Sequence, residues 1–229
     1  MITIVGLGIS CGEHLTLEGL KALKRCDVIF GPKGALPEPV LQLAADFRDT
    51  AAFYHEADTE RLIADAVLAE AEAGRSVALC TVGHPLIFDR PVAALKEKCR
   101  RLKVPCRTIP GISAVDAVLC ELGLAVDQEG FQARQASHIP GTKIDTSLPL
   151  FIFRCNALAA RPDLRRRFIA ALARAYSPAH SACFVESQHV PREGTHVENF
   201  RLGDLADKLA AAPLEATLFV PALKKKRKN

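Results

Sequence analysis

The chain has 229 residues, of which 49% are hydrophobic and 24% charged, a composition typical of a globular protein. Its formal net charge is +4, but residues 224–228 alone contribute five positive charges, so the remainder is nearly neutral and offers no face for nucleic acid. No apolar run reaches the roughly 18 residues that a membrane span needs, and the N-terminus lacks a signal-peptide pattern. We therefore expect a cytoplasmic protein that binds neither nucleic acid nor membrane.

Residues 1–123 alternate between strand and helix patterns. We expect strands at 2–5, 28–30, 76–82 and 104–109, and helices at 15–23, 59–74, 92–102 and 113–122. Because these strands are apolar throughout, the alternation predicts an α/β domain with a mostly parallel sheet and helices on both faces.

The periodicity is lost from residue 123 to about 148, where Gly, Pro, Gln and Ser accumulate, which indicates a linker or a loop-rich entry to a second unit. Beyond it we expect strands at 148–153, 181–186 and 216–220, and helices at 162–176 and 202–211. The longer polar loops predict a smaller α/β domain with a mixed or antiparallel sheet. The expected domains are therefore 1–123 and 124–223, followed by a basic tail, 224–229, that we expect to be disordered, although it could bind an acidic partner.

The eight cysteines are scattered, with no Cys-x-x-Cys pair and no clustering with histidine. This pattern favours free, reduced and mostly buried thiols over disulfides or a metal site.

Ligands of a parallel sheet bind beyond the carboxyl ends of its strands, which here means the loops 6–8, 82–86 and 110–114. The first carries Gly6 and Gly8, but the next glycine is one residue late for a dinucleotide fingerprint, and Phe30-Gly31 stands where an acid is needed. A Rossmann cofactor is therefore disfavoured, and a tight turn explains these glycines as well as a ligand does.

The other two loops carry side chains with two possible roles. His84 could be a catalytic base, but no acid stands near it in the sequence, so we favour a hydrogen-bonding or packing role. Ser113 could cap the helix that follows it or contact a ligand.

Five short motifs occur in a characteristic order: Val5-Gly-Leu-Gly8, His14-Leu-Thr-Leu-Glu18, Cys26-Asp-Val-Ile-Phe30, Gly83-His-Pro85 and Pro110-Gly-Ile-Ser-Ala114. The combination resembles the tetrapyrrole methylase superfamily, over a stretch that extends from the first strand to about Val220. The resemblance implies a two-domain fold, a homodimer, no metal, and S-adenosylmethionine bound between the domains largely through backbone groups, with S-adenosylhomocysteine as its product.

Within this superfamily the chain is most similar to the borosin-type peptide backbone N-methyltransferases. The similarity rests on Gly83-His-Pro85 followed by Ile87-Phe88, and on segments 130–137, 176–180 and 216–221. Carried over by position, the resemblance implies that the cofactor contacts Val82, His84, Ile87, Phe88, Ser113, Ala114, Arg154, Ala216 and Thr217.

The catalytic region departs from that branch, which places tyrosines and an arginine around the long helix after the third strand. Arg61 matches the arginine and could stabilise the imidate oxygen that develops on an amide, while Tyr54 or His55 could remove the proton. One expected tyrosine is His55 and another is Asp65, and Arg154 stands where a glutamine is expected. The alternative is that Arg61 only pairs with neighbouring carboxylates at Glu56, Asp58 or Asp65.

Three functions remain open. Known members of the branch often carry their substrate as a C-terminal extension, whereas this sequence stops at Asn229. We therefore expect a methyltransferase that N-methylates a separate ribosomally made precursor peptide. The second hypothesis is methylation of a precorrin-like tetrapyrrole or another small acceptor, although those relatives commonly have Gly-Asp-Pro in place of Gly83-His-Pro85. The third is a non-catalytic cofactor-binding module, motivated by the missing tyrosines.

Overall fold

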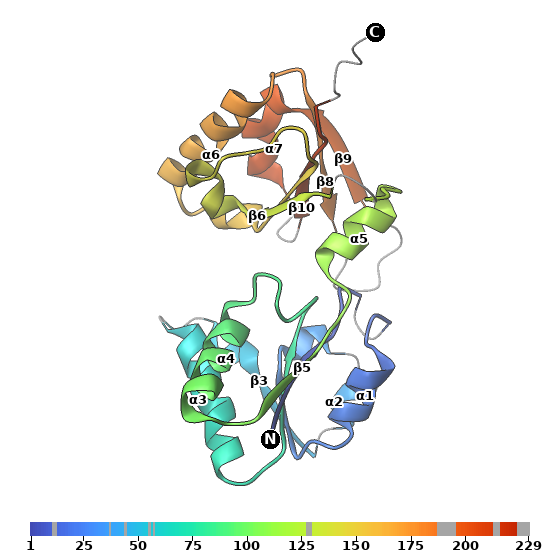
Figure 1. Cartoon of the computed structure of the whole chain (residues 1–229), viewed down its shortest axis with the longest axis vertical. Coiled ribbons are helices and arrows are strands. Elements are labelled where there is room, and N and C mark those ends of the chain that lie inside the picture. Colours follow the sequence, from blue (N-terminus) through green and yellow to red (C-terminus); the bar gives the residue numbers. More distant parts are fainter. Residues whose placement is uncertain are drawn as a thin grey trace. The chain divides into compact units, whose positions relative to one another are not determined.

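The computed structural model describes residues 1–10, 13–36, 38–43, 45–54, 56, 58–126, 130–186, 196–212 and 216–223 (Figure 1). These residues form two compact units, the first comprising residues 1–114 and the second beginning at Val115. Each unit contains a five-stranded sheet with helices, which confirms the predicted α/β class. The sequence predicts a domain boundary at residue 123, whereas the structure divides the chain after residue 114. The helix that precedes residue 123 therefore belongs to the second unit. The basic tail and His55 lie outside the described residues.

The sheet of the first unit, predicted to be mostly parallel, is parallel in every pair of its strands. Its strands are β1 (Ile2–Gly6), β2 (Val28–Gly31), β3 (Asp46–Asp49), β4 (Val77–Thr81) and β5 (Cys106–Ile109), in the order β3-β2-β4-β1-β5. Every residue of β1, β2 and β4 is buried, because helices cover both faces of a parallel sheet.

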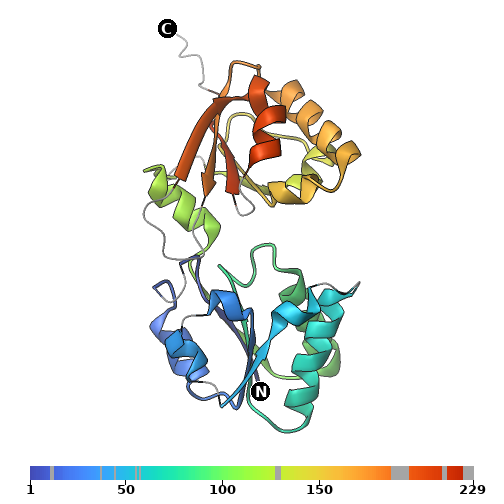
Figure 2. The ribbon, with the colours of Figure 1, turned by 180° about the vertical axis from the view of Figure 1, so that it is seen from behind.

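Two helical layers cover this sheet, as Figures 1 and 2 show from opposite sides. The helices α3 (Thr59–Glu72) and α4 (Arg90–Leu102) pack over Ile4, Phe30 and Leu79. On the other face, α1 (Leu17–Leu23) and the short α2 (Glu38–Leu41) pack over Val5, Ile29 and Cys80. Successive side chains of one strand therefore pack into cores on opposite faces of the sheet, because side chains of a strand alternate between the two faces.

The second unit has a mixed sheet, also as predicted. Its strands are β6 (Gln132–Gln135), β7 (Leu150–Phe153), β8 (Ser181–Glu186), β9 (His196–Arg201) and β10 (Ala216–Val220), in the order β6-β7-β10-β8-β9. Among the described strands of this sheet, only β6 and β7 pair in parallel. The unit's helices are α5 (Ala114–Glu121), α6 (Pro162–Ala175) and α7 (Leu205–Ala211).

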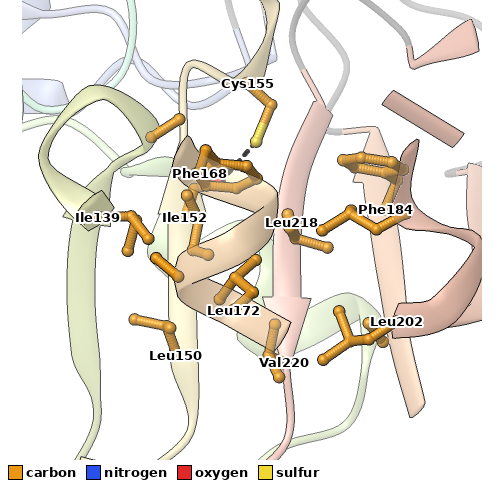
Figure 3. Packing of buried hydrophobic residues seen from close by; sticks show 14 of the residues in the cluster. Ile139, Leu150, Ile152, Cys155, Phe168, Leu172, Phe184, Leu202, Leu218 and Val220 are labelled. Atoms are coloured by element: carbon orange, nitrogen blue, oxygen red, sulfur yellow. Dashed lines mark hydrogen bonds between the residues drawn. The ribbon is translucent and has the colours of Figure 1, made fainter. Parts of the chain in front are cut away.

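The core of the second unit lies between α6 and the sheet. Phe168 and Leu172 of α6 face Ile152 of β7 and Leu218 of β10, and all four are essentially inaccessible to solvent (Figure 3). The amphipathic pattern of residues 162–176 predicted this helix correctly.

Three strands escape the sequence prediction, and all three are edge strands. They are β3, β6 and β9, whose sequences are Asp-Phe-Arg-Asp, Gln-Ala-Arg-Gln and His-Val-Glu-Asn-Phe-Arg. An edge strand pairs on one side only and tolerates charged and polar residues, so no apolar run marks it. The region 123–148 is therefore not wholly irregular, because it contains β6 and a 3₁₀ segment at Ala136–Gly141.

The seven cysteines in the described part of the chain are all free, as predicted. Burial raises the pKa of Cys99 to about 11 and that of Cys155 to about 12, so both thiols stay protonated and inert. Cys120 is an exception to the expected burial, because it is exposed on α5. No helix in the described ranges is long and apolar enough to cross a bilayer.

Candidate functional site

The three loops singled out in the sequence meet at the carboxyl edge of the first sheet. Strands β4, β1 and β5 are neighbours, so the loops that follow them emerge side by side. Gly83 N donates to Gly8 O at 2.8 Å and Gly8 N donates to Gly83 O at 3.3 Å, which joins the first loop to the second. The arrangement presents backbone polar groups at the edge where ligands of parallel sheets bind.

Two glycines, Gly6 and Gly111, allow the backbones of the three loops to approach closely. A Cβ on Gly6 would lie 2.5 Å from Gly111 N and 2.7 Å from Gly83 O, and a Cβ on Gly111 would lie 2.5 Å from Gly83 O. All these neighbours are backbone atoms, which cannot rotate away. The glycines of the motifs therefore have a packing role that holds the three loops together.

His84 is positioned as a hydrogen-bond donor. Its Nδ1 accepts a hydrogen bond from Leu86 N at 3.1 Å, so in the neutral ring the proton resides on Nε2. A ring whose free nitrogen carries a proton donates to a ligand rather than removing a proton from it. This geometry supports the hydrogen-bonding interpretation of His84 over the catalytic base.

Apolar side chains are exposed on the same loops. Leu86 is 56% exposed, Ile87 37% and Ile112 38%. Next to them Phe88 adopts a left-handed backbone with φ of 56°, which is strained for an aromatic residue, and Val82 is half-buried. Exposed apolar groups beside backbone donors fit a ligand such as S-adenosylmethionine, which has both an apolar base and polar groups.

The loop after β5 leads into the second unit. Ser113 is 3% exposed and directly precedes α5, of which Ala114 is the first residue. Its position suits both of the roles that the sequence suggests, a helix cap and a ligand contact.

The remaining expected cofactor residues lie together where two inner strands of the second sheet, β7 and β10, end and begin. Arg154 follows the last residue of β7, and Ala216 and Thr217 begin β10, which runs antiparallel to β7. Arg154 is exposed and has a left-handed backbone with φ of 59°, whereas Ala216 and Thr217 are buried. The structure thus brings Arg154 close to Ala216 and Thr217, which lie far from it in the sequence.

The segment 176–180 of the second unit has a structural role. The Tyr176 ring stacks on His180 with 4.9 Å between centroids, and His180 Nε2 lies 2.8 Å from Pro221 O. The contact ties the end of α6 to the chain that follows β10.

A pocket of about 130 Å³ lies within the first unit at the ends of β2 and β4. The described residues that line it are mostly apolar or neutral: Pro32, Thr50, Tyr54, Ile63, Leu79, Cys80, Thr81, Val82, Asp89 and Pro91. It includes the proposed base Tyr54 and the proposed cofactor residue Val82, although the sequence did not connect them.

The other catalytic candidates are less well placed. Arg61 lies on the exposed side of α3, where it pairs with Asp58 and Asp65 at 3.3 Å each, so the ion-pair alternative describes what the structure shows. Lys98 also binds Asp65, and its hydrogen bond, with help from Arg61, lowers the pKa of that carboxyl. Arg61 is absent from the described lining of the pocket, and His55 lies outside the described residues.

Sequence reasoning missed three polar residues of this pocket, Thr50, Thr81 and Asp89. Asp89 had a recognisable signal, because Asp-Arg-Pro before an apolar run predicts a helix cap, and its carboxylate indeed accepts from Val92 N at 2.8 Å. Thr81 follows four apolar residues at the end of β4 and had no such signal. Across the described ranges, no cluster of His, Cys, Asp or Glu could hold a metal ion.

The chain is similar to known methyltransferases in both sequence and structure. A model of the tetrapyrrole (corrin/porphyrin) methylases matches residues 1–186. A methyltransferase and type I borosin cyclic peptide precursor from Mycena rosella is 27% identical over 172 residues, covering 69% of this chain and 42% of that protein. An S-adenosyl-L-methionine-dependent uroporphyrinogen III methyltransferase from Arabidopsis thaliana is 29% identical over 137 residues, covering 56% and 36%. The chain thus spans about half the length, or less, of such curated relatives.

Among solved structures, a uroporphyrin-III C-methyltransferase from Thermus thermophilus matches with a TM-score of 0.71 and 25% identity. The match covers 100% of this chain and 98% of that one.

Proposed function

Because this chain belongs to the family of tetrapyrrole (corrin/porphyrin) methylases, we propose that it is a methyltransferase that uses S-adenosylmethionine. The observation that carries the proposal is the meeting of the three motif loops through Gly6, Gly83 and Gly111 at the carboxyl edge of the first sheet. This edge offers backbone groups, the His84 donor and exposed apolar side chains, which suit a ligand of mixed polarity.

We further propose that the methyl acceptor is a backbone amide of a separate peptide. The proposal is supported by the match to borosin precursors and by Gly83-His-Pro85 followed by Ile87-Phe88. When bound, the cofactor would supply an electrophilic methyl group for the amide nitrogen, and a base of the chain would take up the amide proton.

The chain's own contribution is alignment and proton removal. An amide nitrogen is a poor nucleophile, so it must be held in line with the methyl group and lose its proton to a base. Tyr54 lines the pocket beside Val82 and is the best-placed described candidate for contact with the acceptor. Arg61 can stabilise the amide oxygen only if it leaves Asp58 and Asp65.

A tetrapyrrole acceptor is the second candidate. It is favoured by the Thermus thermophilus uroporphyrin-III C-methyltransferase, which aligns over the whole chain. We also infer a homodimer, which light scattering of the purified protein would test.

Calorimetric titration with S-adenosylhomocysteine tests the cofactor proposal. We expect about one site per chain and weaker binding by Arg154→Ala. Arg166→Ala is a matched control, because Arg166 is an exposed arginine of the same unit that pairs only with Asp163 among its described ion-pair partners. The cofactor proposal is wrong if the unaltered protein does not bind.

Methylation assays distinguish the acceptors. The protein is incubated with S-adenosylmethionine and either a precursor peptide encoded beside its gene or uroporphyrinogen III. A mass gain of methyl units, about 14 Da each, on the peptide backbone supports our proposal, whereas methylation of the tetrapyrrole alone overturns it.

A further inference from the structure

Strand β5 is an open edge of the first sheet. It is the last strand in the order β3-β2-β4-β1-β5 and pairs only with β1 among the described strands. Ile2 N donates to Pro105 O at 3.1 Å, and bonds between parallel strands recur at every second residue, so Arg107 is the next residue of β5 that bonds to β1. The backbone N–H and C=O groups of Cys106 and Thr108 therefore point away from β1, and no described residue bonds to them.

Three cations flank this open edge. Lys96 of α4 donates a hydrogen bond from Nζ to Thr108 Oγ1 at 3.3 Å. Burial raises the pKa of the Cys106 thiol, and the charge of Lys96 is among the causes that oppose this rise, so Lys96 lies near both outward-facing residues. Lys103 caps the end of α4 just before β5, Arg107 lies on β5 itself, and both side chains are exposed.

The charges of these three side chains are not neutralised within the described part of the chain. None of them forms an ion pair there, and the carboxylate of Glu97 on the same helix is bound by Arg100 at 2.7 Å. The opposite edge strand, β3, differs, because its Arg48 pairs with Asp46 at 3.1 Å and with Glu70 at 2.8 Å. The edge at β5 therefore carries uncompensated positive charge.

Stabilisation of a helix end explains only part of this pattern. A cation at the C-terminus of α4 interacts favourably with the helix dipole, which accounts for Lys103. It does not account for Lys96, in the middle of α4, or for Arg107 on the strand.

The cations decide what can pair with the edge. Lysine and arginine on an edge strand prevent pairing with a second copy of the same edge, because like charges would lie close together. The same charges favour a strand with Asp or Glu side chains, since opposite charges attract across neighbouring strands. A polypeptide also offers backbone groups at the spacing of Cys106 and Thr108, which a nucleic acid or a lipid surface does not.

We propose that β5 is a docking site for an acidic, extended segment of another protein, which adds to the first sheet as a further strand and places its carboxylates beside Lys96, Lys103 and Arg107. The site is formed by the first unit alone. It does not depend on the identity of the methyl acceptor and goes beyond the proposed function.

Hydrogen exchange of the full chain tests this docking. The probe is a short synthetic peptide in which Glu alternates with Val or Thr, and its matched control has Gln at every Glu position. We expect the acidic peptide to slow amide exchange at Cys106 and Thr108, measured by NMR, with little change at Arg107 and Ile109, whose amides already bond to β1. The Gln peptide should bind about tenfold more weakly, and added salt should weaken the acidic peptide most.

Substitutions separate the charges from the backbone. Lys96→Gln, Lys103→Gln and Arg107→Gln should each lower the affinity for the acidic peptide by about two- to fivefold, as expected for exposed ion pairs. Arg174→Gln is the control and should change nothing, because Arg174 is an exposed arginine of α6 without a described ion pair. Thr108→Pro removes an outward N–H without breaking a bond to β1, which an edge strand tolerates, and should lower the affinity by about fivefold or more.

The contrary outcomes are equally specific. Equal binding of the Glu and Gln peptides refutes the role of the charges. Binding of the acidic peptide without slower exchange at Cys106 and Thr108, or tighter binding of a short RNA, shows a general anion surface and overturns strand addition. Slow exchange at both amides in the free protein that is lost on dilution assigns the edge to a second copy of the chain instead. Titration with S-adenosylhomocysteine is independent of these results, so failure of the docking proposal and failure of the proposed function are distinguishable.

Discussion

Replacing Gly6 by alanine tests whether the motif glycines hold the three loops together. The added Cβ would lie 2.5 Å from Gly111 N, 2.7 Å from Gly83 O and 2.8 Å from Gly111 Cα, all closer than ordinary van der Waals contact. Because these are backbone atoms at the ends of β4 and β5, the loops must separate to admit the methyl group. The hydrogen bond from Leu7 N to Thr81 O, 2.8 Å long, lies directly beside this point and would be strained.

Overpacking in a well-ordered core costs about 1–3 kcal/mol, and a clash with backbone on two sides belongs at the upper end. For a chain of this size, each kcal/mol lowers Tm by about 2–4 °C. We therefore expect Gly6→Ala to lower Tm by roughly 6–12 °C, measured by circular dichroism, and to weaken S-adenosylhomocysteine binding at temperatures where the variant is folded.

Gly34→Ala is the matched control, because a Cβ there meets nothing within 4 Å. Its stability should change by no more than about 0.5 kcal/mol, as is usual for a surface substitution. Equal thermal stability of the two variants would refute the packing role of Gly6. A destabilised Gly6→Ala that keeps full cofactor affinity would show that the loops pack there without forming the binding site.

Three further substitutions test individual side chains. Arg61→Ala should change the free energy of unfolding by less than about 1 kcal/mol in urea titration, because its ion pairs are exposed, and a large loss of kcat with unchanged stability would instead establish a catalytic role. Hydrogen bonds from Arg48 and Arg75 lower the pKa of Asp46 from 3.8 to about 2, so its stabilising effect is fully present above about pH 4 and is lost as the pH falls through 2. Asp46→Asn should thus be less stable than the unaltered protein at pH 7, and the difference should be much smaller at pH 2; a pH-independent difference would contradict this. Thr81→Val should leave the free energy of unfolding unchanged or raise it by about 1 kcal/mol, whereas a marked loss would indicate an undetected partner of its hydroxyl group.

The central strands and long helices were predictable because each carries its own pattern. β1, β2 and β4 are fully buried, so each appears as an apolar run that ends at a glycine or threonine. The helix α3 ends as expected beside Gly74, whose φ of +84° suits a residue without Cβ. The edge strands β3 and β6 have charged or amide side chains instead, and their pairing is visible only once the neighbouring strand is in place.

The sequence by itself determined the two α/β units, the order of the motif loops and the resemblance that those motifs carry, because local propensity and short motifs are properties of consecutive residues. The tertiary structure decided which distant residues meet. It placed Tyr54, Thr81 and Asp89 around one pocket and Gly6, Gly83 and Gly111 in backbone contact, and it paired Arg61 with its neighbouring carboxylates. The carboxyl ends of parallel strands gather residues that lie tens of positions apart in the chain, and no local pattern specifies which of them face one another.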